Sequence, residues 1–77
     1  MTQNEWRKRF SERLLTILSD RNMTRAQLAK ESGLSPSRIS DYINLNATPT
    51  PFAALNLAYA LDMSVNDLID FDERVTP

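Results

Sequence analysis

The candidate functional side chains, which lie between residues 25 and 48, are arginines and short hydroxyl, amide and carboxylate groups. Such groups exchange hydrogen bonds, and arginines bind phosphate. The sequence has no histidine and no cysteine, which excludes disulfides, thiolate or imidazole metal sites and the catalytic triads that need either residue. Its one glycine, Gly33, is too few for a phosphate-binding loop or a dinucleotide fingerprint. We therefore predict a binding protein, not an enzyme, with no metal and no cofactor.

Charge is divided unevenly along the 77 residues, although the net charge is only −1. Residues 1–38 carry eight basic and four acidic side chains, a net charge of +4. Residues 39–77 carry one basic and six acidic side chains, a net charge of −5. A polyanion is therefore expected to approach the N-terminal half. The acidic residues at 67–73 lack the spacing and the glycine of a calcium loop, so we expect a solvated helix end there.

Length and hydropathy predict a single domain, residues 1–77, with no membrane partner. The longest unbroken apolar run is residues 57–61, far short of the roughly 20 residues that span a bilayer. The first five residues lack the basic and then apolar order of a signal peptide. A cytoplasmic location is the expectation.

The pattern of apolar residues and caps predicts an all-α fold, a compact bundle of five helices. In the first helix, apolar side chains from Trp6 to Leu18 recur at helical spacing, and Trp6 is expected in the core. Threonines and serines that suit N-caps, twice followed by proline, start later helices, and Asn22 and Gly33 suit left-handed helix ends. The expected helices are about 5–21, 25–32, 36–45, 51–61 and 65–70, followed by a tail, 71–77. In the fourth helix the inward candidates are Phe52, Leu55, Ala58, Tyr59 and Leu61.

Two short helices flank the turn at Gly33, within residues 24–43. Ala29 lies four residues before Gly33, where the helices of a helix-turn-helix cross closely and a small side chain is needed. The apolar positions that would fix the second helix across the first are Leu28, Leu34, Ile39 and Tyr42.

With these positions the sequence resembles the lambda-repressor-like, or Xre/Cro, helix-turn-helix family of phage and bacterial regulators. The resemblance covers about residues 10–69. It is carried by Leu28-Ala29, Gly33-Leu34-Ser35, Ile39-Ser40, the Pro49 loop, Leu55 to Leu61 and Leu68. It implies a third helix that enters the major groove of double-stranded DNA, usually in a homodimer on a palindromic operator. We expect a sequence-specific transcriptional regulator, a small Cro-like phage, prophage or plasmid repressor without a small-molecule ligand.

The resemblance assigns the outward face of the third helix to DNA bases. The candidate base-reading residues are Ser35, Pro36, Ser37, Ser40, Asp41 and Asn44. The candidate phosphate ligands are Arg25, Gln27, Arg38, Asn46 and Thr48. Capping alone also explains Ser35 and Pro36, and a polar face is what any solvated helix shows, so the structural alternative stays open for each residue.

Several positions depart from the family pattern. Arg25 stands where relatives commonly have glutamine, and Pro36 and Asp41 stand where they are often basic. An ion pair that many relatives hold between the first and third helices is replaced by Leu18 and Ile43. Since replacing both members of a buried ion pair by apolar groups can be neutral or stabilising, we expect these two side chains to touch in the core.

The end of the chain has more apolar side chains than a closing helix needs. Val65, Ile69 and Phe71 are the expected dimer interface, and the alternative for Phe71 is to cap the core. A second possible function is a helix-turn-helix protein-interaction module, an antitoxin or antirepressor, that binds a basic partner through the acidic half.

Overall fold

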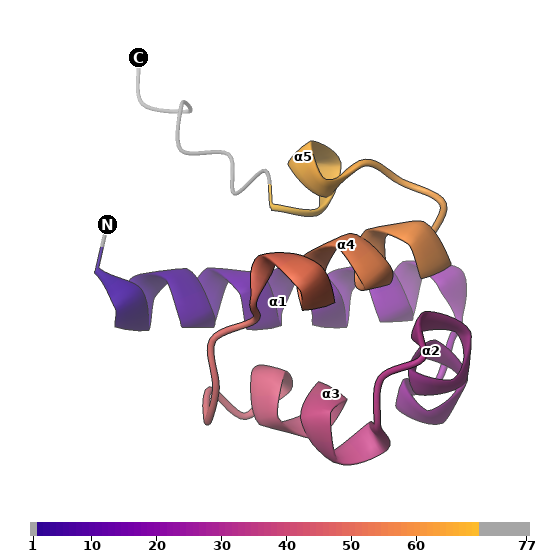
Figure 1. Cartoon of the computed structure of the whole chain (residues 1–77), viewed down its shortest axis with the longest axis horizontal. Coiled ribbons are helices and arrows are strands. Elements are labelled where there is room, and N and C mark those ends of the chain that lie inside the picture. Colours follow the sequence, from indigo (N-terminus) through magenta and orange to yellow (C-terminus); the bar gives the residue numbers. More distant parts are fainter. Residues whose placement is uncertain (1, 70–77) are drawn as a thin grey trace.

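The computed structural model describes residues 2–69, and within them all regular structure is helical (Figure 1). The helices are α1 (Gln3–Arg21), α2 (Arg25–Ser32), α3 (Pro36–Ile43), α4 (Pro51–Ala60) and α5 (Val65–Leu68). The prediction of an all-α fold of five helices is confirmed. None of the helices in these residues is long and apolar enough to cross a membrane.

Each helix begins after a serine or threonine whose side-chain oxygen accepts a hydrogen bond from a backbone N–H three residues later. These caps are Thr2, Thr24, Ser35, Thr50 and Ser64. Each cap satisfies an N–H that has no partner inside its helix. The sequence prediction missed Thr2 and began the first helix at residue 5. In the structure Thr2 and Glu5 form a capping box, so α1 begins at Gln3.

Residues with left-handed backbone follow the first four helices. Asn22 (φ 54°) and Gly33 (φ 75°) end α1 and α2 at the predicted positions. The third helix is shorter than the predicted 36–45, because Leu45 has φ 66° and cannot continue a right-handed helix. The fourth ends at Ala60, one residue before the predicted end, with Asp62 left-handed (φ 55°) just after it.

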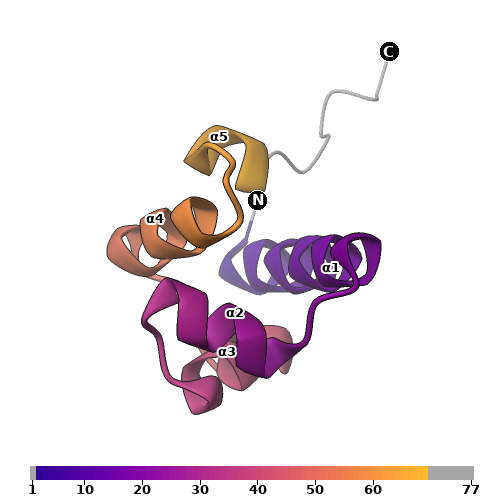
Figure 2. The same ribbon diagram turned by 90° about the vertical axis from the view of Figure 1, so that its right-hand side faces the viewer.

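The helices enclose one core. α3 packs against both α1 and α2, and α4 packs against α2 and α5 (Figures 1 and 2). The fully buried large side chains come from all the helices or, for Leu61, from the residue that follows α4: Phe10, Leu14, Leu28, Ile39, Leu57, Leu61 and Leu68. The short helices of the turn are therefore held by the same apolar cluster as the long first helix.

Aromatic side chains extend this core along α1. Trp6 is half-buried and stacks on Phe10, with ring centroids 5.3 Å apart. Phe10 meets Tyr42 of α3 edge to face at 6.2 Å. Leu18 and Ile43 are both buried in this cluster, and their direct contact stays a prediction.

The predicted inward face of α4 is wrong at three of its five positions. Phe52, Leu55 and Tyr59 are 67%, 52% and 82% exposed. The side chains that α4 itself buries are Ala53, Ala54, Leu57 and Ala58. Small side chains let a helix approach its neighbours closely, so the alanines turn inward and the larger groups are left outside. Since almost every position of this helix is apolar, spacing alone does not select a face.

Candidate nucleic-acid interface

The turn between α2 and α3 depends on backbone conformation at Gly33. Its φ of 75° lies in the left-handed region, and its N–H donates to the Ala29 carbonyl at 3.0 Å. A Cβ built at Gly33 would meet no atom within 4 Å, so glycine is needed for its φ and not for space. Ala29 and Leu34, on either side of the turn, are 3% and 7% exposed. The turn is therefore held in place by the packing of these two side chains in the core.

The third helix has one buried face and one exposed polar face. Ile39, Tyr42 and Ile43 point into the core. Of the residues expected to read bases, Ser40 is half-buried and the others are exposed: Ser35, Pro36, Ser37, Asp41 and Asn44. The structure thus brings the predicted set together on α3 and its two caps, with short side chains exposed to solvent.

Hydroxyl groups fix both ends of α3. At its start, the Ser35 Oγ accepts from the Arg38 N–H at 3.1 Å. At its end, the Ser11 Oγ of α1 donates to the Ile43 carbonyl at 2.6 Å, in a buried position. A last-turn carbonyl has no partner within its own helix, so Ser11 supplies one. Sequence reasoning missed Ser11; the signal was a hydroxyl three residues before Leu14 and seven before Leu18, on the apolar face of the helix.

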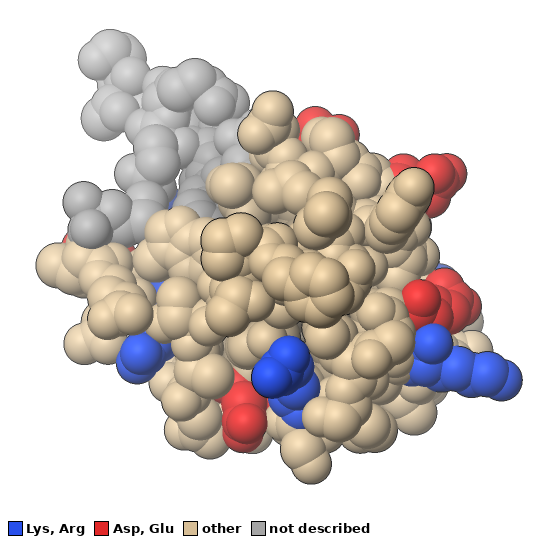
Figure 3. Space-filling model, in the orientation of Figure 1, with Lys and Arg blue, Asp and Glu red and all other residues tan. Residues whose placement is uncertain are grey.

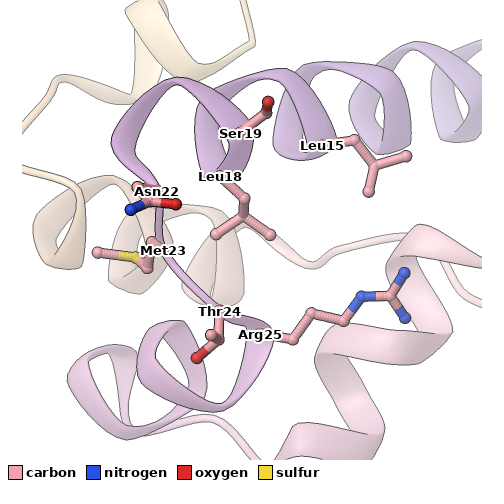
Figure 4. A pocket seen from close by; sticks show the side chains of 7 residues that line it. All are labelled: Leu15, Leu18, Ser19, Asn22, Met23, Thr24 and Arg25. Carbon is pink, nitrogen blue, oxygen red and sulfur yellow. The ribbon is translucent and has the colours of Figure 1, made fainter.

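The start of α2 presents a cation and free backbone donors. Arg25 is exposed, and it borders an open depression between the end of α1 and the start of α2 (Figure 4). The side chains around this depression are Leu15, Leu18, Ser19, Asn22, Met23, Thr24 and Arg25. In Figure 4 the Arg25 side chain extends away from Thr24. The Gln27 Oε1 accepts a hydrogen bond from the Thr24 N–H at 2.8 Å, so the amide NH₂ of Gln27 is available to donate to a phosphate.

The loop after α3 is tied to the start of α1. Thr48 is half-buried, and its Oγ1 accepts from the Arg7 Nε at 2.5 Å and from the Gln3 Nε2 at 3.1 Å. Only the hydroxyl proton of Thr48 is left for a phosphate oxygen. Asn46 and Arg38, the other expected clamps on this side, are exposed.

Two arginines of α1 make hydrogen bonds that stabilise the fold. The Arg13 Nη2 donates to the Asp67 carbonyl at 2.7 Å, and Arg21 donates to the Leu61 carbonyl. These bonds join α1 to the α4–α5 side of the bundle. On the face in Figure 3, the lysines and arginines lie mainly in the lower half, with an acidic group among them, and most of the surface over α4 is uncharged.

Burial shifts the pKa of one ionisable group of α3. Desolvation raises the pKa of the Tyr42 phenol above its ordinary value of 10.0. Tyr42 is therefore neutral at physiological pH and acts as a packing residue beneath the exposed face. Within residues 2–69, no group of three acidic, histidine or cysteine side chains is placed to hold a metal ion.

Of the expected dimer residues, the two that the structure describes lie at α5, away from α3 (Figure 1). Val65 and Ile69 are half-buried and pack against the core from α5 and the residue after it. Phe71 lies outside the described residues.

The comparison with protein families agrees with this arrangement. The family model of the Cro/C1-type HTH DNA-binding domain matches residues 13–74, which include the turn and all of α2 to α5. No curated protein and no solved structure matched the chain.

Proposed function

Because the chain belongs to the Cro/C1-type helix-turn-helix DNA-binding family, we propose that it is a sequence-specific transcriptional regulator that inserts α3 into the major groove of its operator. The observation that carries this proposal is the exposed polar face of α3, held in a fixed position by caps at both ends. A rigid helix with free polar side chains is what reading of base edges requires.

Base reading falls to the short side chains of α3. Serine hydroxyls at Ser37 and Ser40 donate to or accept from several bases, and Asn44 pairs bidentately with adenine. Asp41 accepts from the amino group of cytosine, and Pro36 packs on a thymine methyl. Ser35 adds its hydroxyl proton, since its oxygen already accepts from Arg38.

The residues that bind phosphate lie toward the two ends of the helix-turn-helix. Arg25 and Gln27 stand at the start of α2, where free N–H groups and the helix dipole also attract anions. Arg38 and the loop residues Asn46 and Thr48 form the second clamp, with Arg7 beside Thr48. These contacts position the protein and carry no sequence information.

We further propose a homodimer on a palindromic operator, acting as a small Cro-like repressor of phage, prophage or plasmid type in the cytoplasm. Two identical α3 helices require two identical half-sites, one helical turn apart or a multiple of it. Val65, Ile69 and Phe71, at the C-terminal end, are one set of apolar side chains available for this association.

A mobility-shift titration in two salt concentrations tests the DNA role. With about four to six phosphate contacts per dimer, the log–log slope of affinity against salt should lie between about −3.5 and −5.5. Selection of bound sites from random duplex should return a palindrome. Absence of any shift in low salt would refute the proposal and favour a protein partner.

A further inference from the structure

Three large apolar side chains of α4 are left in solvent. Phe52, Leu55 and Tyr59, which we call the α4 stripe, are 67%, 52% and 82% exposed. They follow one another at spacings of three and four residues, so they line one side of the helix. Only two other large apolar side chains in residues 2–69 are as exposed as 40%, Leu15 and Leu45.

The α4 stripe is large for a domain of this size. From the areas that such side chains bury when covered, it offers about 400 Å² of apolar surface, which is within the range of the largest patches on monomers, patches that are often functional. Most of the surrounding surface over α4 is uncharged (Figure 3). A second surface can therefore cover the stripe without stranding a charge.

No described helix covers this side of α4. In Figures 1 and 2, α2 and α5 flank α4 on opposite sides, and its outer face looks away from α1. The partly buried Val65 and Ile69 pack against the core instead. Within residues 2–69, the α4 stripe therefore exposes more apolar surface than Val65 and Ile69 do.

We propose that the α4 stripe binds the same stripe of a second copy of this chain, in an antiparallel pair related by a two-fold axis. This inference rests on the proposed function, for which it names the dimer interface. The spacing of the stripe is nearly symmetric about residues 55 and 56. An axis there places Phe52 against the partner's Tyr59, Tyr59 against the partner's Phe52, and the two Leu55 side chains together, as an isologous interface requires.

The area of the two stripes alone fits a weak, reversible pair. Together they supply about 800 Å² of buried surface, roughly half of a standard interface and below the roughly 1,000 Å² that a stable one exceeds. Pro51, which is exposed, and Asn56, which is half-buried, flank the stripe and add to the area.

The position of α4 also suits DNA binding. α3 lies on a different side of the bundle from the outer face of α4 (Figures 1 and 2). A two-fold axis that runs from α4 toward α3, vertical in Figure 1, leaves both α3 helices exposed on one side of the dimer. That arrangement is the one a palindromic site needs.

Sedimentation equilibrium of the full chain without DNA tests the interface. We expect wild type to dimerise, and Leu55→Glu to weaken the dimer by at least about a hundredfold, because two carboxylates would meet at the axis. Leu15→Glu is the matched control, since Leu15 is 43% exposed on α1, and it should dimerise like wild type. Circular dichroism of each variant checks that it is folded. A monomeric wild type, or equal dimerisation of all three proteins, overturns the proposal.

A single cysteine gives a second readout, because the chain has none of its own. Asn56→Cys keeps the three apolar side chains and lies beside the axis, so a short bis-maleimide should link it to its partner copy. Leu15→Cys should give little linked dimer. Equal linking of both, or none at position 56 in a dimeric protein, contradicts the antiparallel pairing.

These results separate the interface from the proposed function. A monomer that still shows salt-dependent binding to duplex would refute the α4 dimer alone. A dimer of the expected kind that binds no duplex would refute the DNA role alone.

Discussion

The hydrogen bond from Ser11 to the end of α3 gives the most direct test of how the fold positions its exposed face. Ser11 is 5% exposed, and its Oγ donates to the Ile43 carbonyl at 2.6 Å. Ser11→Ala leaves that carbonyl without its partner, which costs about 1–3 kcal/mol. The higher helix propensity of alanine returns about 0.5 kcal/mol. A domain of this length has only about 4–11 kcal/mol of stability, so the net loss is measurable.

Thermal and urea unfolding, followed by Trp6 fluorescence and circular dichroism, measures the effect. Trp6 is the only tryptophan and stacks on Phe10, next to Ser11 in the sequence, so it reports on this part of the core. A loss of 1 kcal/mol lowers the midpoint of a domain of this size by about 4–8 °C. Ser19→Ala, at an exposed serine of the same helix, is the control and should be neutral or slightly stabilising. If both variants have the same stability, the buried bond does not hold α3.

Three further predictions concern backbone conformation and pH. Gly33→Ala should cost about 1 kcal/mol in urea unfolding, because its φ is 75° and a Cβ meets no atom within 4 Å; a loss above about 3 kcal/mol would reveal a steric role instead. Leu45→Asn should raise stability by up to about 1 kcal/mol, because asparagine tolerates the φ of 66° better than leucine; a lower melting temperature would show that packing of the leucine outweighs its strain. Hydrogen bonds from Thr2 lower the pKa of Glu5 below its ordinary value of 4.5, so its contribution is complete above that pH and is lost as the pH falls through the folded value. Backbone NMR should show the first turn of α1 fraying in that acid range in wild type and no such step in Glu5→Gln.

Local signals of the sequence predicted where four of the helices begin. A cap is a contact between residues three apart, so Thr24, Ser35, Thr50 and Ser64 could be identified without knowing the tertiary structure. Thr2 obeys the same rule, but the apolar pattern begins only at Trp6, so the predicted first helix starts at residue 5. Leu45 could not be predicted, because nothing local marks a leucine for left-handed backbone.

The outward face of α4 could not be predicted either. Its sequence is apolar almost throughout, so helical spacing fits more than one inward face. Choosing between large and small inward groups depends on how closely α4 approaches α2, which is a tertiary property. The exposed face of α3 was predictable for the opposite reason, since its apolar residues form a single stripe, at Ile39, Tyr42 and Ile43.

The hydrogen bond between Ser11 and α3 is a further feature that could not be predicted from the sequence. A serine on an apolar face indicates a buried hydroxyl, but its partner carbonyl lies 32 residues away. Only the packing of α1 against α3 brings the two together.

Binding titrations that compare the selected duplex with a scrambled duplex test the central claim, that α3 reads bases. Fluorescence anisotropy of the full chain and its variants gives the affinities. We expect Arg38→Ala to weaken both duplexes alike, and Ser37→Ala and Asn44→Ala to weaken only the selected one, by about 1–3 kcal/mol each. Equal losses on both duplexes from all three variants would contradict base reading by this helix.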